Sequence, residues 1–307
     1  MNQRLLRPGG SIAVVAPSGS LDPSLLDGGV AALRGAGYRV DVLPSVRGAA
    51  TGVFAASDEA RAADLAEALS RPDVDAVWCA RGGYGAMRAI MALDARGGWR
   101  RFFSQTDKVI VGFSDVTAIH SATVCCGGVG VLGPMLKHLA LHGVDSPDVI
   151  ATLDALQGKP ISIRCAPRRG SVSGRAAGRL IGGNLSILYS MMSTPLMPRP
   201  DGCLLFIEDL SEYRYHIDRM MRSLRFSGFL SKLVGVVVGQ MTGMKDGATP
   251  FGRTAYEVVA DAVADYGYPV LLGFPSGHDP KENYPVLLGA EGCLLVEEGE
   301  ACLTMGF

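Results

Sequence analysis

Short apolar runs alternate with helical patterns through the first half of the chain. The spacing predicts helices over residues 25–35 and 57–69, the second capped by Ser57. Unbroken apolar runs between helices are typical of parallel strands that are buried on both faces. We therefore expect a doubly wound, mostly parallel α/β domain, with functional residues at the carboxyl ends of its strands. The predicted strands are residues 12–16, 39–43, 74–79, 109–113 and 129–132.

The composition changes at residues 159–178, which hold four Arg, three Gly and two Pro and are typical of a linker. This change predicts two domains, residues 1–160 and residues 161–307. The second is expected to be a smaller, mixed α/β domain with antiparallel character. Its predicted strands are residues 203–207, 233–238 and 270–272, with a closing hairpin at 293–296 and 301–305, and its predicted helices are residues 184–192, 212–225 and 255–266.

Composition and charge exclude several classes of partner. The 307 residues include 29 Lys and Arg against 30 Asp and Glu, so no basic face for nucleic acid is expected. No apolar stretch approaches the roughly 20 residues that span a bilayer, and the run at 12–16 is too short for a signal-peptide core. Seven cysteines without a Cys-x-x-Cys pair fit a reducing compartment. We therefore expect a cytoplasmic protein without nucleic-acid or membrane partners.

The segment Gly112-Phe-Ser-Asp-Val116 follows an apolar strand and precedes a helical pattern. A sharp strand-to-helix turn would expose the hydroxyl of Ser114 and set the amide of Asp115 near a positive helix end. The usual elbow pattern has a final glycine, and here that position is Val116. The alternative is that Ser114 simply caps the following helix.

A glycine-rich loop, Arg81-Gly-Gly-Tyr-Gly85, also follows an apolar strand. Gly82 and Gly83 allow the backbone to approach a ligand closely, so the loop is a candidate cradle for an oxyanion or a carboxylate. The patterns of nucleotide-binding loops are absent. The alternatives are a plain tight turn, or a non-catalytic module that binds a nucleotide or a sugar here.

A serine nucleophile needs a base, and His278 is the best candidate among five histidines. It lies in a loop rich in Gly and Pro directly after an apolar strand. His138 and His142 have a metal-like spacing of four, but no nearby third ligand completes a site, so no metal is predicted. His120 is expected to be a packing residue and His216 to lie on a solvated helix.

The orienting acid of such a site would be a carboxylate at the end of a buried strand. Glu208 closes the apolar run 203–207 and meets this description, and Asp209 competes for the same role. The common alternative is a strand end that meets solvent.

Six short segments together resemble one family, the LD-carboxypeptidases, whose members include muramoyltetrapeptide carboxypeptidases and microcin-immunity peptidases. They extend over almost the whole chain in the family's order. The segments are Val15-Ala-Pro-Ser-Gly19, Ala80-Arg-Gly-Gly-Tyr-Gly85, Gly112-Phe-Ser-Asp115, Gly182-Gly-Asn-Leu185, Ile207-Glu-Asp209 and Gly277-His278.

The resemblance implies a serine peptidase with the triad Ser114, Glu208 and His278, and a site between two domains. It implies a homodimer without metal or nucleotide cofactors. The substrate would be a murein tetrapeptide that loses its terminal D-Ala in cell-wall recycling. We expect the amides of Asp115 and of Gly82 or Gly83 to stabilise the oxyanion, and Arg81 to bind the substrate carboxylate.

An alternative keeps the triad and takes a peptidyl-nucleotide, as microcin-immunity peptidases do. The sequence leaves open whether the third peptide residue is meso-diaminopimelate or Lys and whether a sugar or nucleotide carrier is required. It also leaves open whether Cys125-Cys126 does more than pack.

Overall fold

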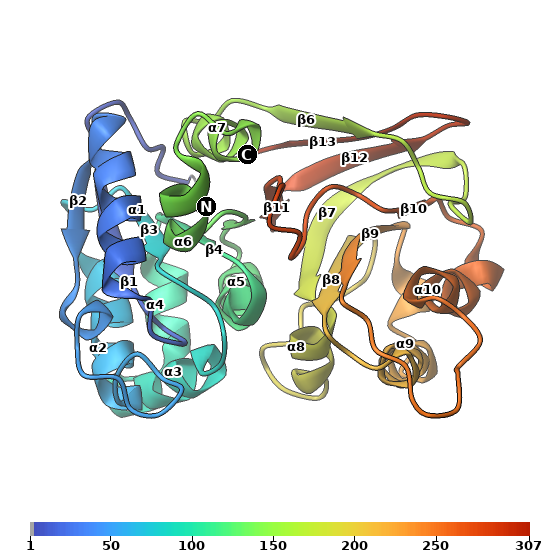
Figure 1. Cartoon of the computed structure of the whole chain (residues 1–307), viewed down its shortest axis with the longest axis horizontal. Coiled ribbons are helices and arrows are strands. Elements are labelled where there is room, and N and C mark those ends of the chain that lie inside the picture. The colour runs from blue at the N-terminus through green and yellow to red at the C-terminus, as the bar shows by residue number, and fades with distance from the viewer. Residues whose placement is uncertain (1–2) are drawn as a thin grey trace.

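The structure is a computed structural model that describes residues 3–307. Its first sheet has six strands in the order β11-β5-β4-β3-β1-β2 (Figure 1). Five of them run parallel, and every residue of β1, β3, β4 and β5 is buried. The strands are β1 (Ser11–Val15), β2 (Arg39–Val42), β3 (Ala76–Cys79), β4 (Val109–Gly112), β5 (Gly130–Leu132) and β11 (Val286–Leu288).

Seven helices accompany this sheet. Helix α1 packs against α6, while α2 packs against α3 and α4. The helices are α1 (Pro23–Gly35), α2 (Asp58–Ser70), α3 (Ala86–Ala92), α4 (Trp99–Gln105), α5 (Thr117–Cys125), α6 (Leu136–His142) and α7 (Pro147–Leu156). The predicted doubly wound, mostly parallel first domain is confirmed.

The second sheet has seven strands in the order β10-β9-β8-β7-β12-β13-β6. Strands β7 to β10 run parallel, whereas β12, β13 and β6 continue from β7 in antiparallel pairs. The strands are β6 (Ile161–Cys165), β7 (Gly174–Asn184), β8 (Leu204–Leu210), β9 (Gly235–Thr242), β10 (Val270–Leu272), β12 (Glu291–Val296) and β13 (Ala301–Gly306). The predicted mixed α/β character is confirmed.

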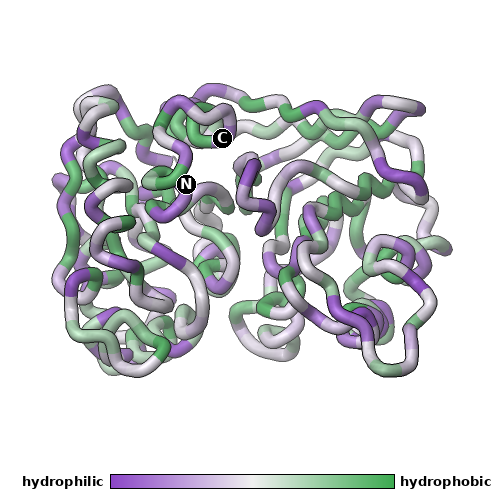
Figure 2. The backbone as a smooth tube through the Cα atoms, in the orientation of Figure 1, coloured by the Kyte–Doolittle hydropathy of each residue, from purple (hydrophilic) through white to green (hydrophobic). Residues whose placement is uncertain are grey.

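Three helices belong to this half: α8 (Leu185–Ser190), α9 (Arg214–Phe226) and α10 (Ala255–Val263). Helix α9 is largely hydrophilic (Figure 2), yet it buries a stripe that includes Ile217, Met221 and Leu224. This amphipathic pattern is typical of a helix that covers a sheet and faces solvent.

Two details of the second half differ from the prediction. Residues 161–165 are not a linker: they form the edge strand β6, whose buried and exposed residues alternate over residues 161–164. The runs at 203–207, 233–238 and 270–272 pair in parallel rather than antiparallel. Their unbroken burial is the same signal that indicated parallel strands in the first half.

Strand β11 comes from the last quarter of the chain, yet it pairs with β5 in the first sheet. The chain therefore crosses between the two sheets after residue 160, and the division at that residue remains a prediction. Within residues 3–307, no helix is both long and apolar enough to cross a bilayer.

Candidate active site

Ser114 lies on a sharp turn between β4 and α5. Strand β4 ends at Gly112, and a 3-10 turn over Ser114–Val116 leads into α5. Ser114 has φ +62°, the left-handed region that non-glycine residues avoid at a cost of about 1–2 kcal/mol. A Cβ at Gly112 would lie 2.4 Å from Cγ1 of Val116, so the turn requires glycine there. The turn has the shape of a nucleophile elbow although Val116 replaces its last glycine.

The glycine-rich loop lies directly against this serine. A Cβ at Gly82 would be 3.0 Å from Cβ and 3.4 Å from Oγ of Ser114. The carbonyl of Gly82 accepts a hydrogen bond from the amide of Gly19, and the exposed Arg81 donates through Nη1 to the carbonyl of Ser20 at 2.7 Å. The loops after β1 and β3 therefore enclose the turn after β4.

The side chain of Asp115 fastens these loops together. Its buried Oδ2 accepts hydrogen bonds from Oγ of Ser18 at 2.6 Å and from the amide of Ala86 at 2.8 Å. Burial raises the pKa of Asp115 above its ordinary value, although these hydrogen bonds oppose the effect. The carboxyl group thus has a structural role, and the amide of Asp115 remains the candidate oxyanion donor.

Arg61 on α2 is a supporting residue that the sequence analysis missed. It is fully buried and its guanidinium donates to the carbonyls of Pro17 and Gly85, which belong to the two loops beside Ser114. It also pairs with Asp58. The sequence signal that could have identified Arg61 is a charged residue on the buried face of an amphipathic helix. A buried arginine almost always has partner groups for its charge.

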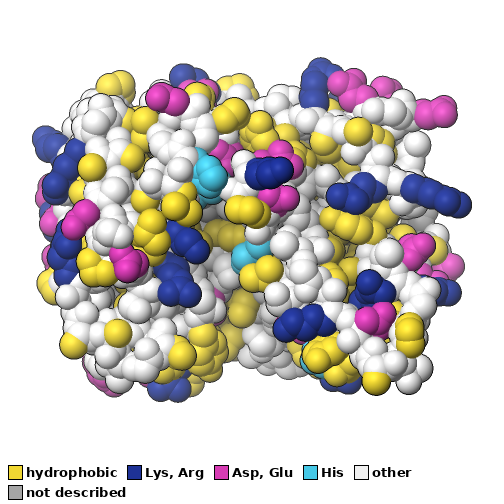
Figure 3. Space-filling view, viewed as in Figure 1, with side chains coloured by type: hydrophobic (Ala, Val, Ile, Leu, Met, Phe, Trp, Pro, Cys, Tyr) yellow, Lys and Arg dark blue, Asp and Glu magenta, His cyan; other side chains and the backbone are white. Residues whose placement is uncertain are grey.

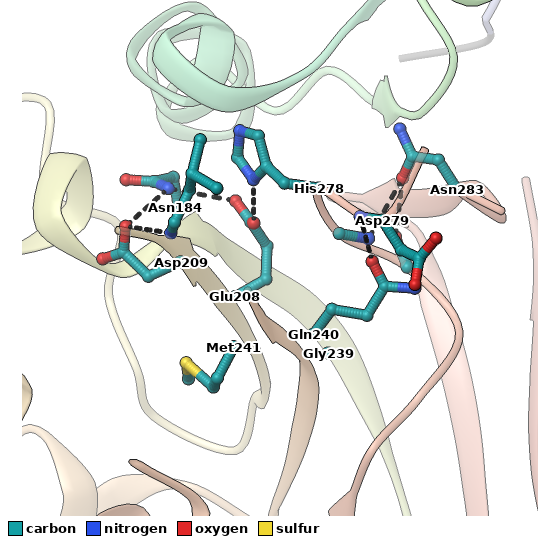
Figure 4. Close-up of polar contacts among 12 residues, drawn as sticks. Asn184, Glu208, Asp209, Gly239, Gln240, Met241, His278, Asp279 and Asn283 are labelled. Carbon is teal, nitrogen blue, oxygen red and sulfur yellow. Dashed lines mark hydrogen bonds and ion pairs between the residues drawn. The ribbon is translucent and has the colours of Figure 1, made fainter. Parts of the chain in front are cut away.

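Glu208 and His278 form an acid–base pair in the second half. Glu208 lies on β8 and is fully buried, and its Oε2 is 2.7 Å from Nδ1 of His278 (Figure 4). Burial alone would lower the pKa of His278, but the hydrogen bond and charge of Glu208, together with the charge of Asp209, raise it above its ordinary value. The arrangement is that of an imidazole whose orientation is fixed by a carboxylate.

Asn184 and Asp209 support the acid. The Nδ2 of Asn184 donates to Oε1 of Glu208 and to Oδ1 of Asp209, each at 3.1 Å (Figure 4). Asp209 also accepts the amide of Ser186, so it faces α8 rather than His278. Burial and the neighbouring charge of Glu208 raise the pKa of Asp209 to about 7. Of the two predicted acids, Glu208 is therefore the one that contacts the imidazole.

The loop that carries His278 is held on both sides. The amide of Gly277 donates to Oδ1 of Asn283 at 3.2 Å, and the amide of Asp279 donates to Oε1 of Gln240 at 2.7 Å (Figure 4). The amide of Asn283 in turn donates to Oδ2 of Asp148 on α7 at 2.9 Å. Polar residues at strand ends and in loops carry no distinctive sequence signal, so these supports were missed.

Phe113 joins the two halves of the site. It precedes Ser114, and its ring packs on the imidazole of His278 with centroids 4.7 Å apart. Figure 3 shows a hollow between the two halves of the molecule on this face. Among residues 3–307, no hydrogen bond joins Oγ of Ser114 to His278. Such bonds often tighten only when substrate binds.

The other histidines lie outside this pair. His120 is fully buried, and its Nε2 donates a hydrogen bond to the carbonyl of Gly112 at 3.0 Å. Burial lowers the pKa of His120 to about 4, which fits the predicted packing role. His216 pairs with Glu212, and His138 pairs with Asp148. In the described part of the chain, no three His, Cys, Asp or Glu side chains are grouped to hold a metal.

Two known family domains define the class of this fold and site. The LD-carboxypeptidase N-terminal domain matches residues 12–133, and the LD-carboxypeptidase C-terminal domain matches residues 177–294. A probable murein peptide carboxypeptidase of Bacillus subtilis is 31% identical, over 99% of this chain and 94% of its own. The chain belongs to the LD-carboxypeptidase family and is a serine carboxypeptidase.

Two solved structures show the same fold. A muramoyltetrapeptide carboxypeptidase from Oxalobacter formigenes has a TM-score of 0.85 and 28% identity, with 97% of this chain and 99% of that chain covered. The microcin C7 self-immunity protein MccF also has a TM-score of 0.85, with 100% of this chain and 98% of that chain covered, at 19% identity. At 19% identity, the similarity to MccF shows a shared fold alone.

Proposed function

We propose that the protein removes the terminal D-Ala from murein tetrapeptides, in the recycling of cell-wall peptides, with Ser114, His278 and Glu208 as its triad. The observation that carries the proposal is the 2.7 Å contact between the fully buried Glu208 and His278, beside the strained turn of Ser114. The likeness to a probable murein peptide carboxypeptidase of Bacillus subtilis and to a muramoyltetrapeptide carboxypeptidase from Oxalobacter formigenes supports this substrate class.

In the proposed acylation, neutral His278 takes the proton of the Ser114 hydroxyl as Oγ attacks the peptide carbonyl. The imidazolium that forms is stabilised by Glu208, which also holds its Nδ1 proton. When the tetrahedral intermediate collapses, the C–N bond breaks and His278 gives its proton to the leaving amine of D-Ala. The role of Glu208 in this step is to orient the ring and to balance the charge of the imidazolium.

In the proposed deacylation, His278 takes a proton from water, and the resulting hydroxide attacks the acyl-enzyme ester. The bond to Oγ then breaks, and the proton returns to Ser114. The product is the tripeptide with a free carboxylate, so the two half-reactions together consume one water and release one D-Ala.

The negative charge of each tetrahedral intermediate needs hydrogen-bond donors beside Ser114. We assign this role to the amide of Asp115 and to the amide of Gly82 or Gly83, because the glycine loop approaches Ser114 so closely that a Cβ on Gly82 would lie 3.4 Å from its Oγ. One such donor typically contributes about 10²- to 10³-fold to the rate. Arg81, exposed at the edge of this loop, is proposed as a substrate-binding residue.

A peptidyl-nucleotide substrate is the alternative within the same chemistry. The two tryptophans of the chain do not favour it, since Trp78 is fully buried and donates to the carbonyl of Pro134, and Trp99 is half-buried against Phe103. Neither offers an exposed ring for a base to stack on. Membership of a carboxypeptidase family argues against a non-catalytic binding module. The cytoplasmic location and the homodimer remain predictions.

The test is a substrate comparison at equal enzyme concentration. The substrates are L-Ala-D-Glu-meso-diaminopimelate-D-Ala, its Lys-containing counterpart, the diastereomer that ends in L-Ala, and an aminoacyl-sulfamoyl nucleotide. We expect one or both D-Ala tetrapeptides to be cut at least 100-fold faster, by kcat/KM, than the L-Ala diastereomer and the nucleotide. Preferred cleavage of the nucleotide would contradict the murein proposal and support the alternative.

A further inference from the structure

A cavity of about 220 Å³ adjoins the imidazole of His278. Its apolar wall is formed by Phe113, Met135 and Leu141, and its polar wall by Lys137 and His142 on α6. We call this cavity the α6 pocket. Its volume is enough for a small amino acid and a few waters, since a water occupies about 30 Å³ in the liquid.

The position of the α6 pocket indicates which part of a substrate it holds. His278 and Phe113 line it, whereas no residue of the glycine loop does. In a triad mechanism the histidine gives its proton to the leaving amine, so the leaving group lies on the imidazole side of the serine. The oxyanion lies on the side of its amide donors, here the loop of Gly82. The α6 pocket is therefore on the leaving-group side.

Lys137 is the cation of this pocket that is available to a ligand. It is exposed, and in residues 3–307 no carboxylate lies within ion-pair distance of its ammonium group. His138, its neighbour on α6, is already engaged at 2.8 Å by Asp148. The one carboxylate that lines the pocket belongs to Asp279, whose Oδ1 accepts the amide of Lys281 at 2.9 Å.

We propose that the α6 pocket receives the leaving D-amino acid and that Lys137 binds its carboxylate. The inference rests on the proposed function and deepens it. It assigns carboxylate recognition to Lys137 in place of Arg81, because Arg81 lies on the glycine loop and already donates to the carbonyl of Ser20 at 2.7 Å. The apolar wall of Phe113, Met135 and Leu141 faces the short side chain of the leaving residue.

The experiment compares a murein tetrapeptide with its C-terminal carboxamide in the wild type and in Lys137→Met. We expect the wild type to prefer the free acid by about 10- to 100-fold in kcat/KM, the range for a hydrogen bond between charged groups. Lys137→Met should lose that factor on the acid and keep the wild-type rate on the amide. Lys281→Met, which alters an exposed cation outside the pocket, should keep the preference. Arg81→Met is measured beside it, because Arg81 is the other candidate for binding the carboxylate.

The outcomes separate the inference from the proposed function. Wild-type turnover with an undiminished preference in Lys137→Met would overturn the inference and leave the proposed function standing. Loss of the preference in Arg81→Met instead would also overturn it and return the carboxylate to Arg81. Absence of turnover by the wild type on every murein peptide would contradict the proposed function and, with it, the inference.

Discussion

Ser114 occupies a backbone conformation that costs free energy, and the surrounding residues maintain it. Its φ of +62° is compatible with the turn because Gly112 leaves space for Val116 and because Asp115 is hydrogen-bonded to Ser18 and Ala86. Strained residues of this kind are concentrated at active sites. The strain is consistent with a side chain held at the end of β4 for chemistry.

Also at the scale of single residues, we expect the charge of Glu208 to set the pH profile of kcat/KM. In the proposed mechanism neutral His278 is the base, so activity should fall as pH drops through the pKa of His278, which is raised above its ordinary value. Glu208→Gln removes the charge that raises this pKa. The acid limb of kcat/KM against pH should then move to lower pH, and the plateau should fall by about 10²- to 10⁴-fold, as for the analogous change in a known triad.

The matched control for this prediction is Glu212→Gln. Glu212 lies just before helix α9 and contacts His216 on that helix at a similar distance, 2.8 Å, in a pair that includes neither Ser114 nor His278. The pH profile of kcat/KM for Glu212→Gln should coincide with that of the wild type. An acid limb that stays in place in Glu208→Gln would mean that this carboxylate does not control the essential base.

Among the elements, the loops at the carboxyl ends of β1, β3 and β4 build the serine side of the site. Their strands were predictable, because each is an unbroken apolar run, and the Ser57 cap of α2 was predicted correctly. Strand β6 was not predictable from the sequence, because Arg164 and the flanking Pro and Gly residues resemble a linker. Only pairing with β13 makes this segment a strand. Edge strands gain their stability from partners distant in sequence.

Gly82→Ala tests the close approach of the glycine loop. The new Cβ would lie 2.9 Å from the carbonyl oxygen of Phe113 and 3.0 Å from Cβ of Ser114, so one of the two loops must move. A displacement of about 1 Å at a catalytic group can cost ~10²-fold in rate. We expect kcat/KM to fall by at least 10-fold, with a lower midpoint in urea.

Gly35→Ala at the end of α1 is the corresponding control, because a Cβ there meets no atom within 4 Å. It should keep full activity and gain about 0.5–1 kcal/mol in unfolding free energy, since alanine loses less conformational freedom than glycine. Equal activity of the two variants would show that the glycine loop does not need to contact Ser114.

At the scale of the whole molecule, the site exists only because two sheets meet. Ser114 follows a strand of the first sheet, Glu208 lies on the second, and His278 lies in the loop between β10 and β11. The family resemblance in the sequence named these three residues, but not the contact of Phe113 with His278. That contact joins residues 165 positions apart, and no local pattern predicts such a pair.

The crossing of β11 predicts that the two halves fold together. A fragment of residues 1–160 lacks β11 and exposes β5 as an unpaired edge in its sheet. We expect this fragment to aggregate or to unfold without a cooperative transition, as followed by circular dichroism in urea. A single sharp transition with native-like secondary structure would instead support residue 160 as the limit of an independent domain.

The most direct test of the account is the release of D-Ala from a murein tetrapeptide, followed by mass spectrometry with wild type and with Ser114→Ala. The substitution removes only the hydroxyl, so both proteins should unfold at similar urea concentrations. We expect the wild type to yield tripeptide and D-Ala, and Ser114→Ala to yield neither at the same enzyme concentration. Wild-type-like release by Ser114→Ala would contradict the assignment of the nucleophile and, with it, the proposed triad.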